Sequence, residues 1–398
     1  MAEKLESSRL HDFLNRAERR CFSAQDMEHA LEKARAAAIP STLEEDWRRT
    51  DPAEFPWDKL ETVDANLTKR DVSVRALGGG EATGFVPLDV QCTDACRNMQ
   101  LISGDDYDAK FLYYHKALNC DSQCFRAMKN YRGDPVEMVQ RATGPGLAVF
   151  NTILVVERGA NVILYDRWET TAESAAAIGR TEIIVEEGAQ LTYLQEDEIP
   201  APFYRRARVQ MAKDAKLLWC AVTPGAPWHA AKLEIALNGS GSHAIFKGLF
   251  AGTKNARADH RTCQYHNAPQ CQSDLTVKTL LAGTSHSVYQ GTISVPHNAQ
   301  QTDAYQQCRN LLLEAGTHAD AIPKLEIIAD DVRCTHGASM GSINKEQLFY
   351  LQSRGLTPRQ AVVAIATGFA EEVIRFVPIE SIQHRWRDLV SRTIGEVN

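Results

Sequence analysis

The spacing of hydrophobic and polar residues along the chain changes twice. Between about residues 136 and 332, short runs rich in Val, Ile, Leu, Thr and Tyr alternate with turns that contain Gly, Asn or Asp, a pattern typical of β-strands. Over residues 3–57 and 106–131, and again from Ile343 onward, apolar residues recur at helical spacing, which predicts helices. We therefore expect a helical N-terminal region at residues 1–135, a strand-rich core at 136–342 and a helical C-terminal region at 343–398.

Within the strand-rich core the sequence repeats itself. Residues 155–165 resemble residues 184–194 and 210–219 and, more weakly, residues 236–246. The turns that mark these repeats contain Gly159, Gly188, Asp214 and Gly241, so the steps are 29, 26 and 27 residues. A strand–turn–strand unit with a nearly constant period is typical of a solenoid, in which each rung buries its apolar face against the next.

The order of these strands favours a parallel or mixed β-helix. No helix-length pattern separates consecutive strands, as a βαβ fold would require. A β-sandwich also has short strands joined by turns, and it stays open as an alternative. We expect an all-β solenoid core with α-helical flanks that cap its two ends.

The C-terminal region carries helix start and stop signals. Asn344 is a capping residue ahead of one short helix, and Gly355 marks the end of that helix. Thr357, followed by Pro and three residues later by Gln360, marks the start of a second helix. A third helix is expected around Trp386.

Composition and charge narrow the function classes. The chain has 44 Lys and Arg against 51 Asp and Glu, a net charge of −7, which argues against nucleic acid as a partner. The N-terminus lacks an apolar run of signal-peptide length, and the longest charge-free apolar stretch is shorter than the ~18 residues that span a bilayer. We expect a cytoplasmic protein with no membrane partner, so its ten cysteines are expected to be free thiols.

Several enzyme motifs are absent from the sequence. It contains no GxGxxG, GxxxxGK[ST] or HExxH, the patterns that carry dinucleotide binding, phosphate binding and zinc proteolysis. Nothing in the sequence therefore indicates nucleotide hydrolysis by this chain.

Cys334 and His336 form the sharpest candidate site. They are two residues apart in a segment that reads as extended, so their side chains are expected on the same face. A thiolate and an imidazole suit iron, zinc or copper(I) better than magnesium or calcium. Two ligands do not close a metal site, so others would come from elsewhere in the chain or from a partner. The alternative is a core thiol beside a histidine that donates to a backbone carbonyl.

A second candidate site consists of four cysteines. Cys92 with Cys96 and Cys120 with Cys124 have the i, i+4 spacing that shares one face of a helix, so the four thiols could hold zinc or a cluster. The spacing is not that of a zinc ribbon and buried cysteines are common, so core thiols stay the favoured alternative. Histidines are also scattered through the core, where solvated rung positions explain them equally well, at positions 229, 243, 260, 266, 286 and 297.

Three segments together resemble a known family. They are Ala-Asp-Asp-Val-Arg-Cys-Thr-His-Gly-Ala at 329–338, Glu-Gln-Leu-Phe-Tyr-Leu-Gln-Ser-Arg-Gly at 346–355 and Gly-Phe-Ala-Glu-Glu-Val at 368–373. This pattern resembles the C-terminal signature of the SufB/SufD family of iron–sulfur cluster assembly proteins. SufB carries a Cys after the Phe-Tyr pair and a Glu after the His, where this chain has Leu351 and Gly337. The resemblance therefore favours the SufD branch over a SufB-like paralogue.

The resemblance implies a fold and a function. The fold is a right-handed parallel β-helix with α-helical N- and C-terminal regions. The function is that of a non-enzymatic scaffold subunit of the SufB–SufC₂–SufD complex, which builds nascent clusters and acquires iron at the interface with SufB. His336 matches a histidine proposed to hold the nascent cluster, with Cys334 beside it, and this cluster would be transient and shared with SufB.

The resemblance also implies partners. A SufC-type ATPase would dock on the helical C-terminal region, and ATP would act only through it. We expect the docking surface to include Phe349, Leu356, Ile365, Phe369 and Val373. A SufB paralogue is the second expected partner, and a homodimer could form in its absence. The resemblance says nothing about the four cysteines between positions 92 and 124.

Two other classes of protein remain as alternatives. A β-helix carbohydrate-active enzyme would use paired carboxylates or Ca²⁺ and would stack sugars on exposed aromatic side chains. The missing signal peptide and the 8% aromatic content count against it. A stand-alone zinc protein built on the four cysteines is the other alternative.

Overall fold

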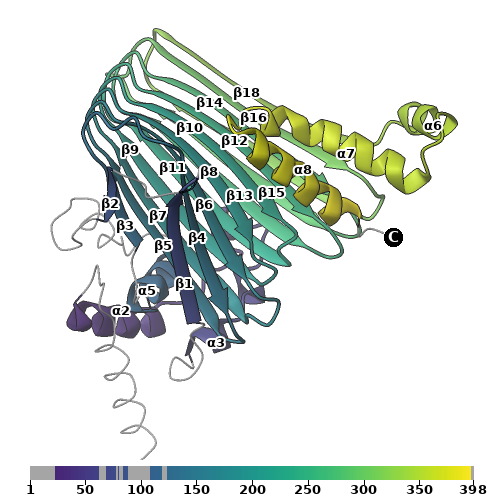
Figure 1. The fold of residues 1–398 in the computed structure, drawn as a ribbon, viewed down its shortest axis with the longest axis horizontal. Coiled ribbons are helices and arrows are strands. Elements are labelled where there is room, and N and C mark those ends of the chain that lie inside the picture. The colour runs from purple at the N-terminus through teal and green to yellow at the C-terminus, as the bar shows by residue number, and fades with distance from the viewer. Residues whose placement is uncertain are drawn as a thin grey trace, which may run out of the picture.

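The computed structural model describes residues 23–61, 69–77, 79, 84–87, 108–118 and 123–395. The chain winds into a β-solenoid of two facing sheets, with helices before and after it in the sequence (Figure 1). Apart from antiparallel pairs at its N-terminal end, neighbouring strands in each sheet are parallel and lie two apart in chain order. This arrangement confirms the predicted β-helix and is not that of a sandwich.

The first sheet contains mainly the even-numbered strands. In spatial order these are β1 (Lys69–Ala76), β4 (Val136–Thr143), β6 (Asn161–Thr170), β8 (Gln190–Glu198), β10 (Lys216–Pro224), β12 (His243–Gly252), β14 (Gln272–Leu281), β16 (Thr302–Leu312) and β18 (Val332–Ser342). The second sheet runs through β17 (His318–Ile327), β15 (His286–Val295), β13 (Arg257–His266), β11 (Trp228–Leu237), β9 (Phe203–Met211), β7 (Ala176–Val185), β5 (Leu147–Val156), β3 (Gln123–Ala127) and β2 (Phe85–Pro87).

The rung period agrees with the sequence repeat. In the first sheet Asn161 pairs with Gln190, Gln190 with Lys216 and Lys216 with His243, which are separations of 29, 26 and 27 residues. The turns of successive rungs stack, since Gly188 N donates to the carbonyl of Lys213 over 2.9 Å. Each of these turns needs a left-handed residue, and Gly188 supplies it with a φ of 65°.

Alternate side chains of the inner strands point into the solenoid and fill it. The interior is mostly apolar but holds buried polar groups that bond to one another. Asp166 accepts hydrogen bonds from Thr152 Oγ1 at 2.9 Å and from Tyr193 Oη at 2.5 Å. Burial raises the pKa of the Asp166 carboxyl, and the nearby Arg205 guanidinium opposes that rise.

The N-terminal elements cover the outer face of the second sheet. They are α2 (Ala24–Ala36), the 3-10 helices η1 (Glu45–Trp47) and η2 (Pro52–Glu54), α3 (Trp57–Glu61) and α5 (Ala109–Leu118). Trp47 is fully buried there and stacks on Trp228 of β11 with ring centroids 6.2 Å apart. Two ion pairs join this N-terminal segment to the last strand of the sheet, from Lys324 to Glu45 and from Arg49 to Asp320.

The region predicted to be helical up to residue 135 also contains strands. Helix α5 agrees with the predicted helices at 106–131, but Phe125 lies on strand β3. There it stacks on Phe85 of β2, with ring centroids 5.1 Å apart, and β3 pairs in parallel with β5. This short segment therefore forms part of the first rung of the second sheet. As a strand it contacts more of the apolar core than it would as a helix. The domain boundaries at 135/136 and 342/343 stay predictions.

Three helices follow the last strand, α6 (Lys345–Ser353), α7 (Pro358–Ile374) and α8 (Glu380–Gly395). Helices α7 and α8 pack against each other and on the outer face of the first sheet, where Trp386 is fully buried (Figure 1). The predicted caps are present: Asn344 accepts from the backbone at the start of α6, and Thr357 and Gln360 form a capping box. None of the helices in the described part of the chain is long and apolar enough to cross a bilayer.

Candidate functional site

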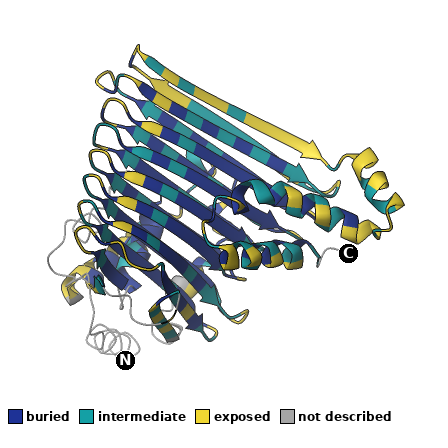
Figure 2. Ribbon diagram, turned by 45° about the horizontal axis from the view of Figure 1, so that its top comes forward, coloured by how far each residue is buried: buried dark blue, intermediate teal, exposed yellow. Residues whose placement is uncertain are grey.

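Among the described residues, the solenoid ends at two strands that have no further rung beside them. Strand β18 closes the first sheet and β17 closes the second. Figure 2 shows β18 exposed along most of its length, whereas the strands of the central rungs are largely buried. Large apolar side chains are exposed here as well, and Ile328 and Met340 are more than half exposed. We call this surface, residues 325–342, the open end.

Cys334 and His336 lie on β18 at the open end. Their register partners on β16 are Ala304 and Gln306, both buried inside the solenoid. Because aligned residues of parallel strands point to the same face, Cys334 and His336 both face the interior side of the last rung, as the sequence spacing predicted. Cys334 is half-buried, whereas His336 is exposed because no rung covers it.

Burial determines the state of the Cys334 thiol. Desolvation raises its pKa above the ordinary value, and a hydrogen bond with the Ala304 backbone lowers it only in part. The thiol is therefore protonated at neutral pH and weakly nucleophilic. A metal ion bound at this position would have to displace the proton, as metal binding to cysteine generally does.

The interior below His336 is polar. Gln264 Nε2 donates to Oε1 of the buried Gln306 over 3.3 Å. A Cβ on Gly291 would lie 2.3 Å from Gln306 Nε2, so glycine leaves the room that this side chain occupies. On the neighbouring strand β16, Cys308 is in register with Ala338 rather than with Cys334, and burial raises its pKa to about 12. The open end therefore presents one accessible imidazole and one partly accessible thiol above a packed polar interior.

Of the four cysteines between positions 92 and 124, only Cys124 lies within the described residues. It is buried on β3. Cys92, Cys96 and Cys120 lie outside the described part of the chain, so the four-cysteine site stays a prediction.

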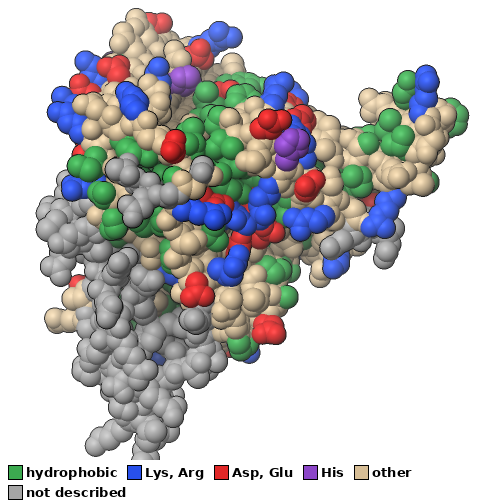
Figure 3. Space-filling model, viewed as in Figure 1, with side chains coloured by type: hydrophobic (Ala, Val, Ile, Leu, Met, Phe, Trp, Pro, Cys, Tyr) green, Lys and Arg blue, Asp and Glu red, His purple; other side chains and the backbone are tan. Residues whose placement is uncertain are grey.

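The predicted docking residues are distributed over both accessible and covered positions. Phe349 on α6 is 73% exposed, and α6 stands out from the body of the molecule with hydrophobic side chains on its surface (Figure 3). Leu356 and Ile365 are half-buried. Phe369 is also half-buried, because the ammonium of Lys278 lies 3.9 Å from its ring centroid. Val373 is fully buried against the first sheet and offers no side-chain surface to a partner.

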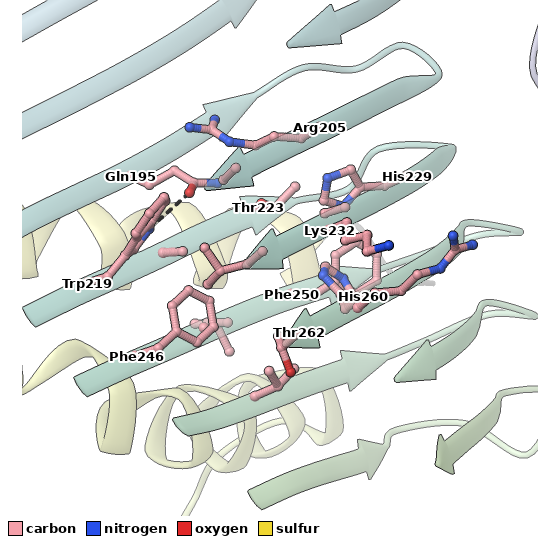
Figure 4. Close-up of a pocket in the computed structure, with 18 residues that line it drawn as sticks. Gln195, Arg205, Trp219, Thr223, His229, Lys232, Phe246, Phe250, His260 and Thr262 are labelled. Atoms are coloured by element: carbon pink, nitrogen blue, oxygen red, sulfur yellow. Dashed lines mark hydrogen bonds between the residues drawn. The ribbon is translucent and has the colours of Figure 1, made fainter. Parts of the chain in front are cut away.

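The interior also contains a cavity of about 60 Å³, which is lined by residues of strands β8 to β14. Arg205, His229 and His260 are among them (Figure 4). The two histidine rings lie 5.1 Å apart on neighbouring strands. Burial lowers the pKa of His260 to about 4 and holds the pKa of His229 well below its ordinary value, so both rings are neutral. This cavity shares no residue with the open end.

Comparison with known proteins points to a single family. The family model for the SUF system FeS cluster assembly SufBD core domain matches residues 139–369, more than half of the chain. The iron–sulfur cluster assembly protein SufD of Escherichia coli is 37% identical over 149 residues. A SufBD family protein of Mycobacterium leprae is 29% identical over 260 residues, and the SufD protein of Bacillus subtilis is 24% identical over 266 residues.

These matches cover only parts of each protein. The aligned stretches span 37%, 61% and 65% of this chain, in the same order, and 35%, 64% and 61% of the three relatives. The chain is thus similar to a third to nearly two thirds of the length of each relative.

Proposed function

The chain belongs to the SufBD core family of the SUF iron–sulfur cluster assembly system, and from this premise we propose that it is a SufD-like, non-enzymatic scaffold subunit. The observation that carries the proposal is the open end, where the last rung has no covering strand and presents Cys334 and His336. A scaffold needs an unfilled surface of this kind for a second chain and shared ligands at the junction.

We propose that the open end binds a SufB paralogue. The unpaired backbone groups of β17 and β18 are able to extend both sheets into a second chain. The exposed side chains of Ile327, Ile328 and Met340 would be buried by that contact, which is the apolar contribution that a stable interface needs. In the absence of the paralogue, two copies of this chain could pair through the same surface.

Within this interface we propose that His336 and Cys334 contribute ligands to a transient iron–sulfur cluster. Both face the interior side of the last rung, so a partner rung would enclose them and supply the remaining ligands. His336 is the stronger candidate, because it is exposed in the free chain, whereas Cys334 is half-buried. Iron acquisition at this junction is part of the same proposal.

A SufC-type ATPase is the second proposed partner, and it would supply the ATP chemistry. The accessible part of the predicted docking surface is Phe349, with Leu356 and Ile365 at its border. Phe369 and Val373 would support the surface from below, because they hold α7 on the first sheet. A docked ATPase would therefore contact α6 and the exposed side of α7.

The direct test of the cluster site is His336→Ala, with Ser339→Ala on the same exposed strand as the matched control. Each variant is co-expressed with the SufB paralogue and the SufC-type ATPase. We expect His336→Ala to assemble into the complex normally but to form less cluster, measured by visible absorption after anaerobic reconstitution. Cluster formation equal to that of the control would make His336 a structural residue.

The docking surface is tested by Phe349→Asp with Gln347→Asp as the control. Both residues are exposed on α6, and both changes add one negative charge, but only the first removes an apolar side chain. We expect Phe349→Asp to abolish co-purification with the ATPase and Gln347→Asp to retain it. Phe369→Asp is a poorer test, since it also breaks the contact of α7 with Lys278. Retained binding by Phe349→Asp would place the docking surface elsewhere.

A further inference from the structure

Three potential metal ligands meet on the outer face of the second sheet, away from the open end's inward face. They are His286 at the start of β15 and His318 and Asp320 on β17. One ligand atom from each lies within 4.8 Å of the other two. Such a set of two imidazoles and one carboxylate is the one that non-haem Fe(II) sites use, and it also suits zinc.

The solenoid itself brings these residues together. His286 and His318 are register partners on adjacent parallel strands, which lie ~4.8 Å apart. Asp320 follows His318 by two residues, so it points to the same side of β17. All three side chains therefore project outward from two neighbouring rungs, on backbone held by the sheet's hydrogen bonds, which is the kind of rigid support a metal site needs.

The distances fit a common metal ion. His286 Nε2 lies 3.0 Å and His318 Nε2 lies 3.6 Å from the same atom, Asp320 Oδ2. Two ligand atoms at zinc bond lengths of ~2.05 Å in a tetrahedral arrangement are roughly 3.3 Å apart. The observed separations lie on either side of that value, so small side-chain rotations would place all three atoms around one ion.

A neighbouring residue fixes the carboxylate. Arg49 Nη1 donates to Asp320 Oδ1 over 2.6 Å, which leaves Oδ2 as the oxygen directed at the imidazoles. Outer contacts of this kind orient metal ligands. His318 is 68% exposed whereas His286 and Asp320 are largely covered, so water can reach the position between them and could complete the coordination.

We propose that His286, His318 and Asp320 bind a divalent first-row transition-metal ion with water in the remaining coordination positions. This site is separate from Cys334 and His336 and does not rest on the proposed scaffold role.

The test is a Co²⁺ titration of the full chain, purified without an affinity tag and stripped with EDTA. Co²⁺ in a site with imidazole ligands gives visible absorption bands, and Zn²⁺ is then added to displace it. We expect one saturable equivalent of Co²⁺. We expect His318→Ala and Asp320→Asn each to weaken binding at least about tenfold. His297→Ala, which removes an exposed histidine from a turn outside the cluster, should leave binding unchanged.

His318 is mostly exposed, so its removal does not threaten the fold, and circular dichroism of the variant verifies this. Absence of saturable Co²⁺ binding by the native chain would overturn the proposal. So would binding that survives unchanged in both His318→Ala and Asp320→Asn, or binding lost to the same extent in His297→Ala.

Discussion

At the scale of single residues, burial decides which side chains can carry charge. His115 on α5 is buried and its Nε2 donates to the carbonyl of Phe150 over 2.8 Å. Desolvation is the largest cause that lowers its pKa, to about 3. His266, also buried, has its pKa lowered to about 4 by desolvation. These rings stay neutral in the folded chain at pH values where the unfolded chain would protonate them.

This difference predicts a loss of stability in mild acid. Because the folded pKa of His115 lies below its unfolded value of 6.5, its contribution is complete above pH 6.5 and declines as the pH falls toward 3. Between pH 7.5 and 5.5 the loss is about 1.4 kcal/mol for this one histidine. His115→Gln keeps a donor for Phe150 but does not titrate.

Urea unfolding of the native chain and of His115→Gln at the two pH values measures the effect. We expect the unfolding free energy of the variant to fall by about 1.4 kcal/mol less than that of the native chain. Other groups act in the opposite direction, because burial raises the pKa of Asp197 to about 6, but they are common to both proteins and cancel. Equal pH dependence of the two chains would contradict the assignment.

The residues of the candidate sites differ in how far the sequence could reveal them. Cys334 and His336 could be paired from the sequence because alternation along one strand is a local property. His286 and His318 could not, because they are 32 residues apart and the rung period varies. Aligning the chain on its rungs would have brought them into register. Whether Val373 is accessible also depends on where α7 packs, which no local pattern indicates.

At the scale of elements, glycine is favoured in a turn that needs a left-handed residue and disfavoured in the interior of a helix. Gly188 lies in a stacked turn with a φ of 65°, and a Cβ there would meet no atom within 4 Å. Gly368 lies in the interior of α7 and is exposed, and a Cβ there would also meet nothing. The two sites therefore isolate backbone preference from packing.

The same substitution should consequently have opposite effects at the two positions. We expect Gly188→Ala to destabilise the chain by about 1 kcal/mol, because alanine disfavours the left-handed region. We expect Gly368→Ala to stabilise it by about 1 kcal/mol, because alanine favours the helix. The midpoint of urea unfolding measures both. A stabilising Gly188→Ala would mean that the turn does not need a left-handed residue.

The turns also explain which elements could be predicted. The steps between Gly159, Gly188, Asp214 and Gly241 reproduce the strand register because each turn has the same φ requirement in every rung. The caps of α6 and α7 are likewise local signals. Strand β3 was missed because a five-residue segment is too short for its own pattern to outweigh a neighbouring helix, and its pairing with β5 is decided by the core.

At the scale of the whole molecule, the open end makes the solenoid asymmetric. Its other end is covered by the antiparallel strands β1 and β2, whereas β17 and β18 have free edges in the described part of the chain. Free strand edges pair readily with another chain. Two copies of the chain are therefore expected to associate through the open end when no paralogue is present.

Light scattering of the purified chain, with and without the double substitution Ile328→Lys and Met340→Lys, tests this expectation. Both side chains are exposed at the open end, and paired lysines would face each other across a symmetric contact. We expect the native chain to be dimeric and the double variant to be monomeric at the same concentration. Leu43→Lys, a change at an exposed leucine on the N-terminal segment, is the control and should remain dimeric.

The ion pairs that tie the N-terminal segment to β17 impose an order on biosynthesis. Glu45 and its partner Lys324 are 279 residues apart, so at roughly 5–20 residues per second the first is made on the order of 15 to 60 s before the second. Trp47 likewise cannot pack until Trp228, on which it stacks, has been synthesised. Residues 45–47 are thus made well before the strands that bind them, and Trp47 stays without its packing partner until β11 is made. Chaperone demand should therefore peak before the final rungs are translated.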